Sequence, residues 1–364
     1  MRYQLLAAVT CAAAAAALVA QGPASAHRGS PEPEVVSSDF AAPFNLEVTR
    51  DRVLVADGFI GAVFSIDRHG GVSPLVPDVI GAAGVATARG GKLLAYTSSV
   101  GDETGFTSTE LHIVGKHGFH AVGDTLAHEN AENPDQHIHY GLTDPTECQT
   151  QTLESIGFPV DYYGALDSHP YSVAAFHGKW VVADAGANAL LLVDNKGNVR
   201  TLAVLPAQPA PITQEAADMF GLDQCVVGAE YAFESVPTDV EVGKDGFLYV
   251  TTLPGGPEDP SLGARGSVYK VDPWTGKSRR IATGFSGATN LALDGDGHIF
   301  VTELFAGRVS IVKHGHPAPF VDLPGAVSVE SARHGGLWAG TVDLSGAGPG
   351  TVVRIAAGKH WHHR

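Results

Sequence analysis

The stretch VPTDVEVGKDGFLYVTT, Val236–Thr252, recurs in form as GATNLALDGDGHIFVTE, Gly287–Glu303. Each copy has a polar residue, an alternating apolar run, a turn of Gly and Asp, and a second apolar run. Alternation with a period of two indicates a β-strand, and Gly with Asp between two such runs indicates a tight turn. The two copies therefore predict two equivalent hairpins.

Counterparts of the second strand of this hairpin occur along the chain, each followed by a short polar or acidic residue. The six segments are Val53–Val55, Leu93–Ala95, Trp180–Val182, Leu248–Val250, Ile299–Val301 and Leu337–Ala339. A third strand follows each segment, and a fourth strand follows in five units. Such units are typical of a six-bladed β-propeller, because one blade cannot bury both of its faces alone. We therefore predict an all-β fold of six four-stranded blades, with a β-sandwich or two stacked barrels as the alternative.

The sixth unit ends near Ala357, before a fourth strand could form. The N-terminal segment Glu34–Asp39 is predicted to supply that strand, which would pair the two chain ends and leave no open sheet edge. The propeller is accordingly predicted over residues 34–358. A flexible linker of residues 27–33 would precede it, and a His-rich tail of residues 359–364 would follow.

The first 26 residues have the form of a secretory signal peptide. Arg2 precedes the Ala-rich apolar run Leu5–Ala20, and Ala-Ser-Ala at 24–26 matches the cleavage pattern of small residues. A membrane anchor is the alternative, but the run is short for a span of about 20 strongly apolar residues. We therefore predict a secreted or extracytoplasmic protein with no membrane span in its mature form.

Acidic residues outnumber basic residues across the chain, 39 to 23, for a formal net charge of −16. This balance argues against nucleic acid as a partner, because nucleic acid requires a basic surface. It permits divalent cations or basic partners, although solubility alone is a simpler reason for the charge. We predict a monomer that binds a small molecule, a glycan or an envelope protein.

Cysteine usage also bears on the fold. Cys11 would leave with the signal peptide, so that Cys148 and Cys225 remain in a compartment where disulfides persist. We predict that these two residues pair, and two free thiols are the alternative.

Long insertions fall in the connections that a propeller places on one face, called the top face below. They cover about residues 124–170, about residues 206–238, and Leu253–Ser267, whereas the turns at the opposite face are short. Long loops are usually functional or disordered, and binding residues gather in loops on a rigid scaffold. The insertions therefore predict a binding face, and structural lids are the alternative.

Three segments carry a resemblance to a known family. They are KWVVADAGANALLLVD (Lys179–Asp194), the segment Val236–Lys270 with its Pro-Gly-Gly-Pro-Glu-Asp-Pro run, and Gly284–Val312. They resemble the ScyD/ScyE family of exported propeller proteins, named for proteins encoded beside genes for the sunscreen pigment scytonemin. The resemblance covers nearly all of the chain after the signal peptide, and it implies a secreted propeller without an established activity. The family usually has Asn-Pro-Tyr where this chain has His169-Pro170-Tyr171.

The first inner positions of the predicted first strands, four of which are polar, should ring the top of the central channel. The six positions are Asn45, Gly84, Ser172, Asp239, Asn290 and approximately Ala326. Asn and Asp oxygens are suitable ligands for a hard cation. They also often cap neighbouring backbone, which is the structural alternative.

This ring pattern is more distantly similar to gluconolactonase/regucalcin-type and NHL-type six-bladed propellers. The gluconolactonase resemblance implies one divalent cation, Ca²⁺ or Zn²⁺, at the top of the channel, held by Asp239, Asn290 and Asn45. It also implies that Asp239 is a general base for ester or lactone hydrolysis. Asn45 stands where that family has Glu, and Ser172 stands where it has Asn.

Other polar residues of the top face are predicted to contact a ligand. The predicted ligand-binding residues are Asn45, His169, Ser172, Asp184, Glu258, Asp259, Arg265 and Glu303. Asp184 and Glu303, like Asp57, follow a second strand, where closing a turn is the alternative role.

Three functions are compatible with these patterns. The first is a non-catalytic propeller that binds a ligand or protein on its top face, and the insertions together with the incomplete catalytic set favour it. The second is a metal-dependent lactonase or esterase-like hydrolase at the channel mouth. The third is an assembly or scaffold protein of the cell envelope.

Overall fold

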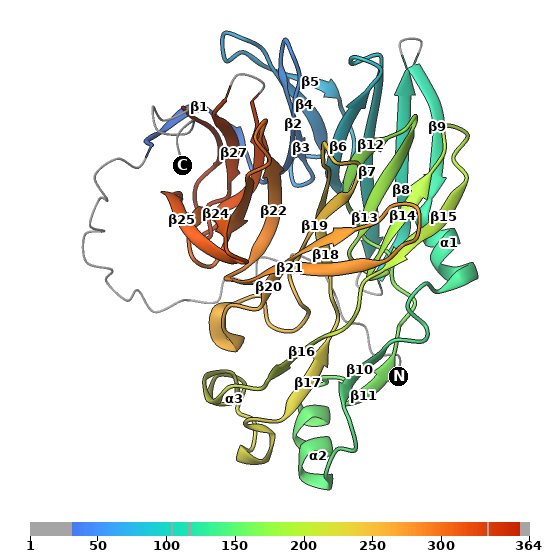
Figure 1. The fold of residues 1–364 in the computed structure, drawn as a ribbon, viewed down its shortest axis with the longest axis vertical. Helices are drawn as coiled ribbons and strands as arrows, with labels where there is room; N and C mark the ends of the chain where they lie inside the picture. The colour runs from blue at the N-terminus through green and yellow to red at the C-terminus, as the bar shows by residue number, and fades with distance from the viewer. Residues whose placement is uncertain (1–30, 103–104, 116–117, 333–334, 357–364) are drawn as a thin grey trace.

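The computed structural model describes residues 31–102, 105–115, 118–332 and 335–356 (Figure 1). The predicted signal peptide (1–26), most of the predicted linker and the His-rich tail (359–364) lie outside the described residues. The described part of the chain forms seven four-stranded antiparallel sheets. Among the described residues, no helix has the length and apolarity needed to cross a membrane.

Six of the sheets, here called ring sheets 1–6, follow one another along the chain. Ring sheets 1–3 consist of β2 Pro43–Val48, β3 Val53–Asp57, β4 Ala62–Ile66 and β5 Val72–Val76; β6 Ala82–Ala88, β7 Leu93–Asp102, β8 Gly105–Gly115 and β9 Gly118–Asp124; β12 Pro170–Phe176, β13 Lys179–Asp184, β14 Ala189–Val193 and β15 Val199–Val204. Ring sheets 4–6 consist of β18 Pro237–Val242, β19 Leu248–Thr252, β20 Gly266–Val271 and β21 Ser278–Phe285; β22 Ala288–Leu293, β23 Ile299–Glu303, β24 Arg308–Lys313 and β25 His316–Asp322; β26 Ala326–Ser331, β27 Leu337–Thr341, β28 Gly350–Ile355 and β1 Pro33–Phe40. The strands predicted from the repeats lie within these elements.

The six ring sheets together form a closed ring. Their first strands, called the inner strands (β2, β6, β12, β18, β22 and β26), each contact the next, and β26 contacts β2. The N-terminal strand β1 pairs antiparallel with β28, with Glu34 opposite Arg354 and an Arg354 Nη2–Glu34 Oε2 ion pair of 2.7 Å. The predicted pairing of the two chain ends is therefore observed, and it removes the open edge of the last sheet.

The apolar core lies between neighbouring sheets rather than within any one of them. Strands such as β14, of sequence ALLLV, are buried along their whole length, whereas the outermost strand β5 is largely exposed. Leu190 and Val181 of ring sheet 3 share one apolar cluster with Val250 of ring sheet 4. A corresponding cluster lies between each other pair of adjacent ring sheets. The short Val- and Leu-rich runs of the sequence therefore form strands that are covered on both faces.

The seventh sheet, called the insertion sheet, was not predicted. It takes β10 His139–Leu142 and β11 Asp161–Tyr163 from the first long insertion, and β16 Gln208–Pro211 and β17 Glu230–Phe233 from the second. Helices α1 Thr125–Glu132, α2 Glu147–Ser155 and α3 Gln214–Phe220 and the short 3₁₀ helices η1 Gln224–Val226 and η2 Pro260–Leu262 accompany it. In Figure 1 the insertion sheet, α2 and α3 project below the ring. The two insertions are therefore one folded lobe, not separate loops.

A disulfide joins the two insertions, as predicted. Cys148 at the start of α2 is bonded to Cys225 in η1. The lobe has its own apolar cluster, which includes Leu153, Val226 and Tyr231. Helix α2 begins with a capping box, in which Thr146 and Gln149 each accept a hydrogen bond from the other's backbone N–H. Local helix signals, a small core and one cross-link thus combine to order the insertions.

Candidate ligand-binding site

All six inner strands begin with the same irregularity. Where each pairs with its second strand, the register shifts at Pro43/Asn45, Ala82/Val85, Pro170/Ser172, Pro237/Asp239, Ala288/Leu291 and Ala326/Ser328. A β-bulge of this kind redirects side chains and is often found beside functional sites. The sixth polar position is Ser328 and not Ala326 as predicted, because the strand begins two residues before its bulge ends.

The polar ring ties neighbouring sheets together. Asn45 Oδ1 accepts the backbone N–H of Val85 at 3.2 Å, and Asn290 Oδ1 accepts that of Val329 at 2.8 Å. Asp239 Oδ2 accepts the backbone N–H of Leu291 at 2.9 Å. In each case the donor lies on the inner strand of the next sheet. Inner strands have one edge without a strand partner, so their N–H groups need acceptors from side chains.

Three ring residues also meet across the channel. Ser172 Oγ donates to Asp239 Oδ1 at 2.5 Å, and Asn45 Nδ2 lies 3.4 Å from the same oxygen and 3.5 Å from Ser172 Oγ. Burial raises the pKa of Asp239 to about 6, and the hydrogen bonds from Ser172 and the Leu291 backbone oppose that rise. Asn45, Asp239 and Asn290 are called brackets below, because the side chain of each joins its own inner strand to the backbone of the next one. Metal binding by Asp239, Asn290 and Asn45 stays a prediction. It would require their oxygens to give up the backbone hydrogen bonds that they accept.

The bracket role makes a stability prediction for Asn290→Ala. The substitution removes the acceptor of the Val329 N–H at a site where Asn290 is 2% exposed. A buried donor left without a partner costs about 1–3 kcal/mol. We therefore expect urea unfolding of Asn290→Ala to show a free energy of unfolding that is lower by about 1–3 kcal/mol. The control Asn198→Ala, at an exposed position, should stay close to wild type. Equal midpoints for Asn290→Ala and wild type would contradict the bracket.

A second polar layer lies two residues further along the inner strands. Glu47, Glu241 and Glu330 occupy matching positions in ring sheets 1, 4 and 6, and Ala86, Ala174 and Ala292 occupy them in the other three. Burial raises the pKa of Glu330 to about 8, and the charges of Glu47 and Asp239 add to the rise. Burial and the neighbouring Glu330 likewise raise the pKa of Glu241 well above its usual range. The centre of the ring is therefore acidic below the ring of brackets.

The acidic residues that end the second strands of three ring sheets close turns. Asp57 accepts the backbone N–H groups of Ala41 and Ala42 at 2.7 and 3.0 Å. Asp184 Oδ1 accepts the His169 N–H at 2.6 Å, and Glu303 Oε2 accepts the Ser286 N–H at 2.8 Å. In all three sheets the carboxylate holds the segment that leads into its own inner strand. Ligand contacts by Asp184 and Glu303 stay predictions beside this structural role.

A cavity of about 430 Å³ lies where the insertion lobe meets the ring. Its walls come from the long β7–β8 hairpin, from both insertions, from the turn after β13 and from the Pro-Gly-Gly-Pro-Glu segment. The aromatic residues that line it are Phe106, Phe158, Tyr162, Tyr231 and Phe233, and the acidic ones are Asp102, Asp167, Glu234 and Glu258. No basic side chain is among the described lining residues. The cavity thus combines ring faces with negative charge.

The aromatic rings of the wall pack against one another in tilted pairs. The ring centroids of Phe158 and Tyr231 are 5.2 Å apart, and those of Tyr231 and Phe233 are 4.6 Å apart. The Arg265 guanidinium carbon lies 4.4 Å from the centre of the Phe233 ring, and Arg265 donates to the carbonyls of Gly255 and Pro254 at 3.1 and 3.2 Å. Arg265 is not among the residues that line the cavity, and its contacts hold Phe233 and the Pro254–Gly255 backbone in place.

The acidic wall holds unusual carboxyl groups. Burial raises the pKa of Asp167 to about 6, with a further contribution from the charge of Asp184. Burial raises the pKa of Glu234 to about 7, although the hydroxyl of Tyr162 donates to its Oε1 at 3.1 Å. Burial also raises the pKa of Glu258. A cationic group in the cavity would favour the ionised form of all three.

The remaining predicted site residues have separate positions. Glu258 lines the cavity, whereas Asp259 caps η2 by accepting the Ser261 N–H at 2.7 Å. His169 packs against Phe106 and Tyr171, with ring centroids 4.7 and 5.5 Å away, and burial lowers its pKa to about 4. Of the predicted ligand-binding set, the structure therefore places only Glu258 in the cavity lining.

Sequence reasoning missed most of the cavity. Asp167, Glu234 and the packed rings of Phe158, Tyr231 and Phe233 all come from the two insertions, which carry no repeat by which to align them. The signal that was present is compositional: EYAFE at 230–234 and DYYGALD at 161–167 mix aromatic and acidic residues within long connections. Such mixtures in a loop favour a binding role over a purely solvated one.

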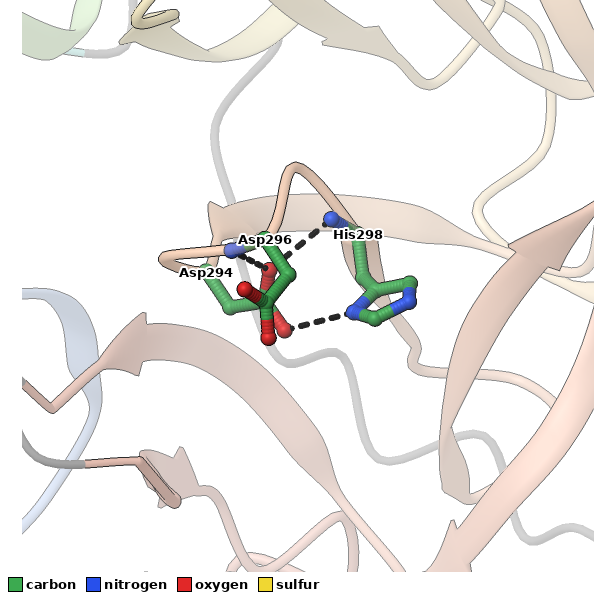
Figure 2. A group of neighbouring side chains, drawn as sticks. All are labelled: Asp294, Asp296 and His298. Atoms are coloured by element: carbon green, nitrogen blue, oxygen red, sulfur yellow. Dashed lines mark hydrogen bonds and ion pairs between the residues drawn. The ribbon is translucent and has the colours of Figure 1, made fainter. Parts of the chain in front are cut away.

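One compact group of potential metal ligands lies elsewhere, in the β22–β23 turn (Figure 2). Ligand atoms of Asp294, Asp296 and His298 lie within 4.8 Å of one another. Asp294 already accepts the backbone N–H groups of Asp296 and His298 at 2.8 and 2.9 Å, and its Oδ2 lies 2.7 Å from His298 Nδ1. These contacts are those of an ordinary Asp-initiated turn.

Comparisons with known proteins bear on the fold alone. No family model and no curated protein matches the chain. Among solved structures, a candidate glucose dehydrogenase from Thermus thermophilus is 14% identical with a TM-score of 0.51, covering 89% of this chain and 99% of that one. A candidate gluconolactonase is 12% identical with a TM-score of 0.50, covering 92% and 94%. A Bacteroides thetaiotaomicron protein of unknown function is 10% identical with a TM-score of 0.51, covering 90% and 72%. With the ring of antiparallel sheets, this likeness identifies the fold as a β-propeller.

Proposed function

We propose that this protein is an exported six-bladed propeller that binds a small organic cation with an aromatic or ring-shaped body. The six blades are the six ring sheets, and the ligand site is the cavity under the insertion lobe. The observation that carries the proposal is the lining itself, which places aromatic rings beside acidic groups and contains no basic residue among the described ones. Cations are attracted both to aromatic faces and to carboxylates.

The size and form of the cavity support a small-molecule ligand. A volume of about 430 Å³ lies within the range of small-molecule pockets, about 300–1,000 Å³. The walls come from distant segments that a disulfide and a shared sheet hold in place. A preformed cavity of this kind limits the ordering cost of binding. Export, a monomeric state and membership of the ScyD/ScyE family are parts of this proposal that rest on the sequence.

The proposal predicts charge-selective binding. Calorimetry would compare benzyltrimethylammonium, benzyl alcohol and benzoate, which share a ring and differ in charge. We expect the ammonium to bind most tightly and to bind more tightly as the pH rises from 6 to 8, because Asp167 and Glu234, with pKa values of about 6 and about 7, ionise over that range.

Variants test the same point. Glu234→Gln should weaken binding of the ammonium about tenfold or more, the order expected for loss of a buried charge partner. It should leave binding of the neutral alcohol nearly unchanged. Asp296→Asn, in the distant β22–β23 turn, serves as the matched control. Preference for benzoate, or equal loss of all probes in Glu234→Gln, would count against a cationic ligand.

A metal-dependent lactonase at the channel mouth is the second candidate. The observation in its favour is the convergence of Asn45, Ser172 and Asp239, together with the pKa of Asp239 of about 6. A general base exchanges protons most efficiently when its pKa is near the pH at which the enzyme works. Metal-dependent hydrolysis across a lactone panel, lost in Asp239→Asn, would support it. No specific contact favours the envelope scaffold, which stays a prediction.

A further inference from the structure

The segment Glu129–Asp135, at the end of α1, contains buried side-chain oxygens without hydrogen-bond partners. They are Glu129 Oε1 and Oε2, Asn133 Oδ1 and Asp135 Oδ1. Glu129 and Asp135 are each 1% exposed. A buried acceptor without a donor, and above all a buried carboxylate without a counter-charge, is strongly unfavourable. Such a concentration within seven residues therefore calls for a positively charged partner.

The surroundings make the deficit larger. Burial raises the pKa of Glu129 to about 8, and the charges of Asp184, Asp135 and Asp167 add to the rise, although the Asp167 backbone N–H approaches and opposes it. Within the described residues, none of these four acids takes part in an ion pair. The last turn of α1 has no basic residue, and a helix C-terminus itself carries negative partial charge.

The neighbouring contacts hold the segment in place. Asp135 Oδ2 accepts the Tyr140 hydroxyl at 2.9 Å and Asn188 Nδ2 at 3.0 Å, which leaves Oδ1 without a donor. Asn133 takes a left-handed conformation at the helix end, and its Nδ2 donates to the Gly164 carbonyl at 3.0 Å. A side chain at Gly164 would collide with Asp135, because its Cβ would lie 1.9 Å from Oδ1. The side chains of Asn133 and Asp135 are thus held by their own partners, and one oxygen of each stays free.

We propose that Glu129, Asn133 and Asp135 form a Ca²⁺ site that fastens the end of α1 to the insertion lobe and to ring sheet 3. Carboxylate and amide oxygens without His or Cys are the ligand set of a hard cation. Ca²⁺ suits the set better than Mg²⁺, because it accepts flexible geometry and more ligands. The site is separate from the turn of Figure 2, where the carboxylate of Asp294 already has its partners.

The site does not depend on the proposed organic ligand, because the cavity lining includes none of its three ligand residues. It has a consequence for the lobe, however. Asp135 contacts Asn188, and Asn188 Oδ1 accepts the Val236 N–H at 2.9 Å at the end of the second insertion. Ca²⁺ bound by Asp135 would therefore stabilise both insertions where they leave the ring.

The test is Ca²⁺ titration of the chelator-treated protein, by calorimetry and by thermal unfolding. We expect about one Ca²⁺ per chain and a Tm that rises with Ca²⁺ concentration, since a ligand that binds only the folded state stabilises it. Glu129→Gln and Asp135→Asn should each weaken Ca²⁺ binding about tenfold or more, and Asp296→Asn should bind as wild type does. Two variants are used so that a folding defect in one leaves the other informative.

The chelated samples supply a second readout. Without Ca²⁺, Glu129→Gln should melt at or above the wild-type temperature at pH 8, because it removes a buried carboxylate that lacks a partner. The proposal is overturned if wild type binds no Ca²⁺, if both site variants bind like wild type, or if Asp296→Asn abolishes binding. If Ca²⁺ neither binds to wild type nor raises its Tm, and Glu129→Gln is more stable than wild type only at high pH, the proposal fails. That result would show instead that the buried Glu129 carboxyl group is protonated.

Discussion

Replacing Cys148 and Cys225 together by Ser is expected to lower the free energy of unfolding by about 4 kcal/mol. The bond closes a loop with a sequence separation of 77, and the loss of that constraint in the unfolded chain has this order of magnitude. The bond lies in the insertion lobe, whose small apolar cluster makes the lobe depend on a cross-link. We therefore expect the lobe to open first, with the ring still folded.

Two probes separate the lobe from the ring. Trp180, Trp274 and Trp338, the tryptophans of the described part, lie in the ring sheets or in their turns. Tryptophan fluorescence should therefore report on the ring, while limited proteolysis and binding of benzyltrimethylammonium report on the lobe. In urea the double variant should lose the lobe signals well before the fluorescence changes. Wild type treated with reductant is the matched control, and coincident transitions at the wild-type urea concentration would contradict the prediction.

Raising the pH from about 6.5 to about 8.5 is expected to destabilise the folded protein by about 2 kcal/mol through Glu330 alone, in the presence of a chelator. The pKa of Glu330 is raised to about 8 by burial and by the charges of Glu47 and Asp239. In the unfolded chain the same group has a pKa near 4.3. The folded state therefore holds one more proton between these values, and stability falls as the pH rises from the lower value to the upper one.

Other groups do not cancel this effect in that range. The pKa of His169 is lowered to about 4 by burial, which makes the folded state less stable only below the usual His value of about 6.5. Exposed turn residues such as Asp67 and Asp194 have lowered pKa values because backbone and side-chain groups donate to them, so they matter only in acid. The predicted slope is thus due to the buried carboxyl groups.

A substitution isolates the channel contribution. Glu330→Gln keeps the size of the side chain and removes its charge, so its stability advantage over wild type should grow by about 2 kcal/mol between pH 6.5 and pH 8.5. Glu154→Gln, on the exposed surface of α2, is the control and should follow the wild-type pH profile. Urea unfolding at several pH values measures both. A wild type whose stability is constant from pH 6.5 to pH 8.5 would show that these carboxyl groups are compensated in solution.

Much of the fold could be predicted from the sequence, because its information is local and repeated. Alternation in PTDVEV and in its counterparts specifies which side chains face the channel and which face the next sheet. Asp and Gly specify the turns, and the missing last strand identified Glu34–Asp39 as its replacement. The pairing of Cys148 with Cys225 could also be predicted, since only two cysteines follow the predicted signal peptide.

Tertiary structure decided the rest, because the deciding contacts join segments that share no pattern. Sequence placed Asp239 and Asn290 at equivalent points, but only the closed ring shows that their oxygens accept N–H groups of the neighbouring inner strands. Asp184 and Glu303 were both predicted to contact a ligand, and the structure shows that both accept hydrogen bonds that close turns. The insertion sheet pairs β10 with β17 across a whole ring sheet of intervening chain, and that pairing builds the cavity and places Asp167 beside Glu234. Repeats in the sequence predict how each strand pairs and which of its faces is buried. A site assembled from insertions depends on long-range packing, which no local period encodes.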